Sequence, residues 1–356
     1  MTTTQDFVSS RVTPATAEIL ISSDSHIIEP LDLWTSRLPA KFKDTAPYYP
    51  EMRNVSMDKP GGHDPNERLK EMLTDGVSAE VLYPTLGLRT FALEDPALQE
   101  ATFRAYNDWI AEYCQVSPNR LVGVPMISMF NMDVAVKELE RCAKAGLKGA
   151  IIWQSPHPDL PFDSTHYDPF WKAAQELDMP VSIHILTGFN YSVDLLGRTG
   201  LDVYRSSVNQ KLIEAADTLF YIVFSGVLER FPKLKIVVVE NEIGWIPFVV
   251  SQWDKYYQRP NSRKRAPLTL TMLPSEYINR QVFATFFNDP PGGYMLGYWG
   301  EDNCMWSNDY PHPNSTWPHS REVIARDLSH LTPEAKAKIV RGTVTNLYGL
   351  KIPEIS

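Results

Sequence analysis

Short apolar runs recur along the chain and are separated by segments with helical periodicity. Most of these runs are β-branched or aliphatic, as in strands that are buried on both faces. Eight runs are therefore strand candidates: Glu18–Ser22, Ala79–Tyr83, Leu121–Ile127, Gly149–Trp153, Pro180–His184, Leu234–Val239, Gln281–Phe286 and Asn303–Ser307.

Helical patterns lie between most of the predicted strands. They cover Leu98–Cys114, Asp133–Ala145, Pro169–Leu177, Val208–Arg230 and Pro333–Leu347. The second helix stops at Gly146, as a C-cap would. The last one opens with Thr332-Pro333, an N-cap followed by proline at the first helical position. Eight strands alternating with helices predict an α/β fold, a closed (β/α)8 TIM barrel.

Two segments are longer than a minimal barrel requires. Leu31–Arg68 follows the first strand and is rich in proline, aspartate and aromatic residues, and Gln252–Pro274 follows the sixth and is basic. Loops of this length usually act as lids or interface elements. The chain has no internal repeat, low-complexity tract or linker. We therefore expect one barrel domain over residues 1–356, with loop insertions at 31–68 and 252–274.

Composition excludes several classes of function. The 356 residues have a formal net charge of −9 and no run of like charges, so a nucleic-acid partner is not expected. No apolar stretch is long enough to span a membrane, and the N-terminus shows no secretory signal. Three cysteines without a paired motif fit a reducing compartment, so we expect a cytoplasmic protein.

Carboxylates and imidazoles occur at the ends of four predicted strands. Asp24 and His26 follow the first strand, and in an extended backbone two such residues point the same way. His184 ends the fifth strand, Glu240 follows the sixth and Asp309 follows the eighth. Strand C-termini form the active-site rim of a barrel. These residue types at that rim predict a divalent metal site.

Each candidate residue also has a structural interpretation. His184 could be a hydrogen-bonded core histidine, and Asp309 could form a turn before Pro311. Glu240 is costly to bury unless it is paired or bound to metal. His312 is expected near the metal or the substrate. Glu80 opens an apolar strand and is a further candidate ligand, with an ion pair to a basic residue at the barrel bottom as the alternative.

Several segments spread over most of the chain match a known enzyme family. They are Asp24–Pro30, Asp75–Thr85, Asn119–Pro125, Gly146–Ile152, Phe224–Pro247 and Ser307–Pro318, together with His184. Through them the chain resembles the second amidohydrolase family, metal-dependent (β/α)8 enzymes that include aminocarboxymuconate-semialdehyde decarboxylase. The resemblance implies that Asp24, His26, His184 and Asp309 are metal ligands.

The departures from that family bear on function. Glu240 stands where the family's decarboxylases have a catalytic histidine, and Asp24 replaces the first histidine of the usual His-x-His. The four carboxylates of Asp24, Glu240, Asp309 and Glu80 would balance two divalent ions. Oxygen-rich ligation with two imidazoles suits Fe or Mn better than Zn. In this respect the chain is similar to a branch of the superfamily with a dinuclear non-haem site, the 2-aminoisobutyrate hydroxylase-like enzymes.

The sequence predicts a metal-dependent enzyme, with one favoured function and two alternatives. The favoured function is O2-dependent hydroxylation of a small organic substrate at two ions, Fe and/or Mn, with Glu240, Asp309 and His312 in catalytic roles. The first alternative is a hydrolase, with Zn, or a non-oxidative decarboxylase, each with a mononuclear site. The second is a metal-free partner subunit.

Residues in the long loops bear on the substrate and on assembly. Arg89 would suit a carboxylate-bearing substrate. The other candidate pocket residues are Trp34, Phe189, Trp306, Tyr310 and His312. Aromatic residues beside arginine are typical of interface cores, so we expect a homo- or hetero-oligomer of related barrels. The residues concerned are Trp253, Tyr256, Tyr257, Arg259, Arg263, Lys264 and Arg265.

Overall fold

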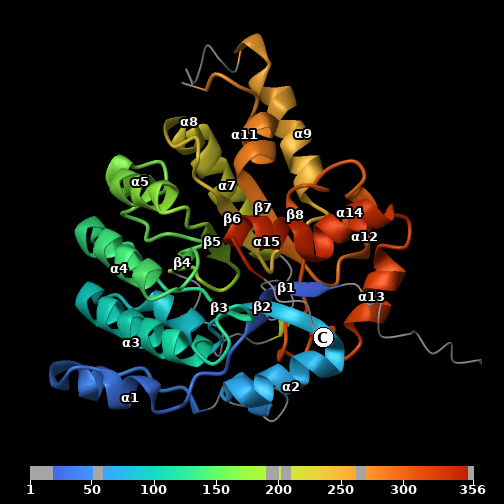
Figure 1. The fold of residues 1–356 in the computed structure, drawn as a ribbon. Coiled ribbons are helices and arrows are strands. Elements are labelled where there is room, and N and C mark those ends of the chain that lie inside the picture. The colour runs from blue at the N-terminus through green and yellow to red at the C-terminus, as the bar shows by residue number, and fades with distance from the viewer. Residues whose placement is uncertain (1–18, 51–58, 190–199, 202–209, 262–269, 352–356) are drawn as a thin grey trace, which may run out of the picture.

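The fold is a ring of parallel strands surrounded by helices. The structure is a computed structural model that describes residues 19–50, 59–189, 200–201, 210–261 and 270–351. Figure 1 shows the strands at the centre, with the helices around them in chain order. The strands are β1 Leu20–His26, β2 Val77–Tyr83, β3 Leu121–Gly123, β4 Ala150–Ile152, β5 Val181–His184, β6 Ile236–Val239, β7 Val282–Phe286 and β8 Cys304–Trp306.

Two parallel ladders, β1-β2-β3 and β4-β5-β6-β7-β8, make up the ring. A parallel bridge between Met126 and Ile151 joins β3 to β4. At the other junction the Ser23 hydroxyl donates to the Trp306 carbonyl at 2.9 Å. The amide of Asp309 also donates to the Asp24 carbonyl there, at 3.1 Å. The ring is therefore closed, and the predicted (β/α)8 barrel is confirmed.

Strand β1 is longer and less regular than the sequence predicts. It was expected to end at Ser22 but continues to His26. Ser22 pairs with Glu80 and Ser25 pairs with Leu82, so three residues of β1 advance against two of β2. This extra residue is a β-bulge, which can redirect neighbouring side chains.

Helices fill the connections between the strands. They are α1 Leu33–Arg37, α2 Pro65–Asp75, α3 Pro96–Cys114, α4 Met132–Lys144, α5 Asp168–Glu176, α7 Ala215–Phe224, α8 Val227–Arg230, α9 Ile246–Tyr257, α11 Pro274–Gln281, α12 Pro290–Met295, α13 Ser320–Asp327, α14 Pro333–Ala337 and α15 Thr343–Tyr348. Caps fix their starts: the Asp95 carboxylate accepts from the amide of Ala97 at 2.9 Å at the start of α3. Among the helices of the described residues, none has the length and apolar character needed to cross a membrane.

Two of the predicted helices are interrupted. The segment predicted as Val208–Arg230 contains a π-helical turn at Gln210–Glu214, and α7 and α8 are separated at Gly226. Gly226 has a φ of 79°, which a continuous helix cannot accommodate. A second π-helical turn, Lys338–Gly342, lies between α14 and α15. Residues 208–209 lie outside the described part of the chain.

The two long loops contain more regular structure than their composition suggests. The first includes α1, short 3-10 turns at Ala40–Thr45 and Pro60–Gly62, and the start of α2. The second opens with the end of α9, which runs to Tyr257, and closes at Pro274, the first residue of α11. Residues 51–58 and 262–269 lie outside the described residues, and with them Arg263, Lys264 and Arg265. That residues 1–356 form one domain stays a prediction.

The aromatic residues expected at a subunit interface differ in their surroundings. Tyr257 is buried and donates its hydroxyl hydrogen to the Leu270 carbonyl at 2.9 Å, so it serves the fold of its own chain. Trp253 packs against Phe224, with ring centroids 5.7 Å apart. Tyr256 is exposed, and the Arg259 guanidinium lies 4.0 Å from its ring centroid. The oligomer stays a prediction.

Candidate metal centre

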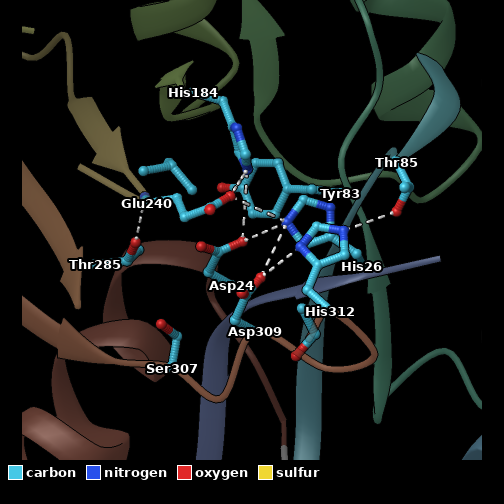
Figure 2. A network of polar contacts seen from close by, with 12 residues as sticks. Asp24, His26, Tyr83, Thr85, His184, Glu240, Thr285, Ser307, Asp309 and His312 are labelled. Carbon is cyan, nitrogen blue, oxygen red and sulfur yellow. Dashed lines mark hydrogen bonds and ion pairs between the residues drawn. The ribbon is translucent and has the colours of Figure 1, made fainter. Parts of the chain in front are cut away.

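Six acidic and imidazole side chains meet at the C-terminal ends of the strands. Asp24 and His26 come from β1, His184 from β5, Glu240 from the turn after β6, and Asp309 and His312 from the loop after β8. Figure 2 shows their side chains pointing toward one another. They form two overlapping groups that share His26 and Glu240, and within each group the ligand atoms lie within 4.8 Å of one another.

The distances between these atoms suit coordination of an ion. The Nε2 atom of His26 lies 3.5 Å from Asp24 Oδ1, 3.7 Å from Glu240 Oε2 and 3.6 Å from Asp309 Oδ1. The Nε2 atom of His184 lies 3.8 Å from Asp24 Oδ1 and 3.6 Å from Glu240 Oε2. These separations exceed hydrogen-bond lengths. Ligands about 2.1 Å from a shared ion stand roughly 3–3.5 Å apart.

Several of these atoms are buried without a hydrogen bond. Within the described residues, neither carboxylate oxygen of Asp24 has a hydrogen-bond partner, and neither do Nε2 of His26, Nε2 of His184 and Oε2 of Glu240. An unsatisfied buried polar atom costs about 1–3 kcal/mol. A divalent cation among these atoms would satisfy all of them at once, so the residues fit a metal ion.

Hydrogen bonds on the far side of each ring fix the histidine tautomers. The Nδ1 atom of His26 is 2.8 Å from the carbonyl oxygen of Pro84. The Nδ1 atom of His184 is 2.7 Å from the carbonyl oxygen of Ile185. A carbonyl can only accept, so Nδ1 must donate in both rings. Each Nε2 therefore presents a lone pair to the centre, as metal-binding histidines do.

The backbone is strained at two candidate ligands. Glu240 has a φ of 57° and Asp309 a φ of 55°, both in the left-handed region. Non-glycine residues held there cost about 1–3 kcal/mol each, and such strain concentrates at functional sites. The hydroxyl of Thr285 accepts from the Glu240 amide at 3.0 Å and supports this turn. The strain lets both side chains enter the cluster directly after their strands end.

The electrostatics of the cluster favour a cation. Burial lowers the pKa of His26 to about 4, so its imidazole is neutral and available as a ligand at pH 7. Burial acts in the same direction on His184, but the Asp24 carboxylate raises the pKa of His184 above its usual value. Burial raises the pKa of Asp309 to about 7. The carboxylates thus attract a positive charge, a proton or a metal ion.

His312 is the member of the cluster that can carry a proton. Its Nδ1 atom donates to the Asp309 carboxylate at 2.9 Å, and its Nε2 atom is 3.2 Å from the Thr85 hydroxyl. Burial alone would lower the pKa of His312, but Asp309 raises it to about 9. The ring lies 4.0 Å from that of His26. The Asp309 carboxylate thus favours the protonated form of His312 next to the candidate ligands.

Glu80 is not part of this cluster, contrary to its expected role as a ligand. It is buried, and its Oε2 accepts from Nε of Arg68 on α2 at 2.5 Å. Tyr83 faces the barrel interior, where its hydroxyl lies 3.0 Å from that of Ser182. Residues three apart on a strand face opposite sides, so Glu80 faces outward. The ion-pair interpretation holds, but with a helix arginine rather than one at the barrel bottom.

Two predicted pocket residues are also placed elsewhere. Trp34 is buried between α1 and α3, and its indole N–H donates to the Thr102 carbonyl at 3.2 Å. Tyr310 donates its hydroxyl hydrogen to the Glu71 carboxylate, and the Arg68 guanidinium lies 4.4 Å from its ring centroid. Both residues serve packing rather than a pocket.

An aromatic group lies on the loops after β3, β4 and β5. The Phe189 ring is 4.3 Å from His157 and 6.1 Å from Trp153, and Phe130 is 4.8 Å from Trp153. Arg89 is half-buried, with its guanidinium 5.9 Å from the Tyr49 ring centroid. Trp306 is buried at the end of β8. Of the predicted pocket residues, Phe189 thus lies in an aromatic wall on the metal side of the barrel.

Sequence reasoning missed a buried glutamate that shapes the rim. Glu29 accepts from the backbone amides of Leu86 and Gly87 at 2.8 Å each, and from Thr85 at 3.3 Å. It thereby holds the loop from which Thr85 reaches His312. Burial raises the pKa of Glu29 to about 7. The signal was a charged residue directly after the apolar pair Ile27-Ile28.

The chain is similar to characterised and structurally solved proteins. It is 24% identical over 282 residues to gamma-resorcylate decarboxylase of Polaromonas sp. (strain JS666 / ATCC BAA-500), covering 73% of this chain and 79% of that one. An amidohydrolase from Mycobacterium avium subsp. paratuberculosis K-10 superposes with a TM-score of 0.76 at 19% identity, covering 95% and 99% of the two chains. A dihydroxybenzoic acid decarboxylase from Polaromonas sp. JS666, solved with bound manganese and 2-nitroresorcinol, gives 0.70 at 21% identity, covering 95% and 99%.

The structural likenesses show the same barrel fold. The family assignment rests on the sequence, because residues 23–350 match the model of an amidohydrolase family, Amidohydro_2. This match spans the strands that bear all six clustered residues. The chain therefore belongs to the second amidohydrolase family and is an enzyme of the amidohydrolase superfamily.

Proposed function

We propose that this enzyme uses a divalent metal ion to decarboxylate a small organic acid without an oxidant. The main support is the set of buried, unpaired ligand atoms on Asp24, His26, His184 and Glu240 beside the protonated His312. Several relatives support the reaction type, because they are named as decarboxylases, and the dihydroxybenzoic acid decarboxylase of Polaromonas sp. JS666 was solved with manganese. They do not favour the O2-dependent hydroxylation that the sequence suggested.

Asp24, His26, His184 and Glu240 would hold the ion, with Asp309 as a further ligand. Imidazole and carboxylate together suit Mn, Fe or Zn. When bound, the ion supplies positive charge that stabilises the electrons left behind as CO2 departs. Its immediate surroundings are buried, so water is largely excluded from this charge.

His312 supplies the proton that the reaction requires. Loss of CO2 breaks a carbon–carbon bond and leaves an electron pair on the carbon, which must then bond to hydrogen. We assign this proton to the imidazolium of His312, which Asp309 orients through Nδ1 at 2.9 Å. The neutral imidazole regains a proton from water, which balances the conversion of a carboxylate and a proton to CO2 and the protonated product.

The aromatic wall supports an aromatic substrate. Phe130, Trp153, His157 and Phe189 lie on loops at the C-terminal face of the barrel, where barrel enzymes bind their substrates. Phe130, His157 and Phe189 are partly exposed and can contact a planar ring, whereas Trp153 is buried. The dihydroxybenzoic acid named for a structural relative is a ligand of this shape.

A second candidate function remains O2-dependent hydroxylation at two ions. It is favoured by one observation, the two overlapping groups of four ligands that share His26 and Glu240. The set includes the carboxylates of Asp24, Glu240 and Asp309, whose negative charge would offset most of the charge of two divalent cations.

One experiment separates these functions. Protein loaded with Mn2+ under argon is mixed with dihydroxybenzoic acids, CO2 release is followed, and metal content is determined by elemental analysis. The proposal predicts one ion per chain and CO2 release without O2. Two Fe or Mn ions per chain, O2 uptake and no CO2 release under argon would instead favour hydroxylation. Protein that binds no divalent metal under any condition would refute both.

A further inference from the structure

A buried polar layer lies outside the barrel wall, between β1, β2 and α2. Its members are Arg68 on α2, Glu80 on β2 and Asn308 after β8, and all three are buried. Arg68 Nε donates to Glu80 at 2.5 Å, and Asn308 Nδ2 approaches Glu80 and Asp75 at 3.4 Å each. A buried ion pair is often no more stabilising than an apolar pair of similar volume. The layer therefore calls for an explanation other than stability.

One end of the layer holds the backbone of a candidate metal ligand. Arg68 Nη1 donates to the main-chain carbonyl of His26 at 2.7 Å. The same side chain is fixed from two other directions, by Glu80 and by the Tyr310 ring at 4.4 Å. The guanidinium that hydrogen-bonds the His26 carbonyl is therefore itself held in place. A methionine of similar volume could fill the space but could not hold this carbonyl.

The other end of the layer holds the segments around Asp24 and Asp309. The side-chain oxygen of Asn308 accepts from the hydroxyls of Ser22 at 3.0 Å and Ser25 at 2.8 Å. It also accepts from the backbone amide of Tyr310 at 3.1 Å. Ser22 and Ser25 flank the bulge that directs Asp24 inward, and Tyr310 directly follows Asp309. A single amide therefore spans the first and last strands of the barrel at the level of the ligands.

Two features of these segments require such support. β1 is bulged at this level, and no backbone ladder pairs it with β8 in the described strands. Asp309 adopts a left-handed backbone conformation that a non-glycine residue avoids unless its surroundings impose it. Backbone pairing toward β8 consists here of single hydrogen bonds, from the Asp309 amide to the Asp24 carbonyl at 3.1 Å and from the His26 amide to the Tyr310 carbonyl at 2.6 Å. The buried side chains therefore add the support that a ladder between β1 and β8 would give.

We propose that Arg68, Glu80 and Asn308 are positioning residues that fix Asp24, His26 and Asp309 in the arrangement that binds a divalent ion. This inference rests on the proposed metal centre. Groups that orient metal ligands typically change metal affinity by about 10–100-fold when they are altered. The layer also links α2 to the centre, so a displacement of α2 would be transmitted to the His26 carbonyl.

The test uses Mn2+ as the probe and two variants of different severity. Arg68→Lys keeps the charge but loses the planar fork. Ser25→Ala removes only one hydroxyl, which donates to Asn308 next to His26. This milder variant should fold even if Arg68→Lys does not. Arg120→Lys is the matched control, because Arg120 donates to the Ser78 carbonyl of β2 at 2.8 Å and the substitution keeps the positive charge that Arg120 places near Glu80.

Mn2+ affinity is measured by the electron paramagnetic resonance of the free ion, and the bound-ion spectrum reports the symmetry of the site. We expect about 10-fold weaker binding or more, with an altered bound spectrum, in Arg68→Lys and Ser25→Ala, and wild-type values in Arg120→Lys. The melting temperature of the metal-free protein separates this effect from loss of stability. Wild-type affinity and spectrum in both variants would overturn this inference but leave the proposed metal centre intact. Wild-type protein that binds no Mn2+ would overturn the metal centre together with it.

Discussion

Replacing Asp24 with asparagine tests the metal centre most directly. The change keeps the shape of the side chain and removes one negative charge that faces both His26 and His184 at 3.5 and 3.8 Å. Because neither oxygen of Asp24 has a hydrogen-bond partner in the described structure, its carboxylate has no evident structural role. We therefore expect Asp24→Asn to remove the stabilisation by metal without unfolding the protein.

The size of this effect follows from linkage. An ion at 100 times its dissociation constant stabilises the folded protein by about 2.7 kcal/mol. For 356 residues the unfolding entropy near 60 °C is about 0.75 kcal/mol per kelvin. Mn2+ should thus raise the melting temperature of the wild type by about 4 °C. If Asp24→Asn weakens binding about 100-fold, the same Mn2+ concentration gives about 0.4 kcal/mol, a shift below roughly 1 °C.

In the metal-free protein we expect Asp24→Asn to raise the melting temperature slightly. It removes a buried charge and introduces an amide N–H that can donate to Nε2 of His26 or His184. Scanning calorimetry with a chelator and then with Mn2+ gives both values for each protein. Asp95→Asn is the control, since it makes the same chemical change at the N-cap of α3, outside the cluster. A wild-type Mn2+ shift in Asp24→Asn would refute the assignment of Asp24 as a ligand.

Three further predictions concern individual groups of the centre. His312→Gln should retain metal but lose about 10²–10⁴-fold in the rate of CO2 release, measured by single-turnover kinetics, because a general acid is removed; an unchanged rate would place the proton donor elsewhere. Glu240→Gln should weaken Mn2+ binding in an equilibrium titration while circular dichroism stays unchanged, and full metal content with lost activity would make Glu240 an acid–base group instead. Burial raises the pKa of Asp309, so a proton on its carboxyl group competes with the metal as the pH falls. Mn2+ affinity should therefore rise between pH 5 and 7 and level off above it, with proton release detectable by calorimetry in two buffers; a flat profile would count against Asp309 as a ligand.

The barrel could be predicted from the sequence because its strands are buried on both faces. Ile236–Val239 is a continuous apolar run, and this pattern can be recognised without knowing which strands lie beside it. The end of β1 could not be predicted in this way. Its serines look like loop residues, and several of their hydroxyl hydrogen bonds run to Asn308 and to β8, which follow almost 300 residues later. Gly226 likewise divides a segment whose periodicity is continuous.

The candidate site was largely predictable because strand C-termini converge in any barrel. Asp24, His26, His184, Glu240 and Asp309 all follow this rule, and the structure brings them together. Glu80 shows where the rule stops. Its residue type suits a ligand, but the face of the barrel to which its side chain points depends on the alternation of side chains along β2. Its partner is an arginine from α2, which composition alone does not place beside it.

The junction between β1 and β8 has a consequence for biosynthesis. Asp24 and Asp309 lie at opposite ends of the chain, and the described strands meet there through side chains and single backbone bonds rather than a ladder. A nascent chain that has not yet released β8 from the ribosome therefore lacks one ligand and the amide that orients two others. We therefore expect the metal to bind only after β8 has closed the barrel. A chain truncated before Cys304 should bind Mn2+ far more weakly than the full chain, and equal binding by the two would show that the centre forms before the barrel closes.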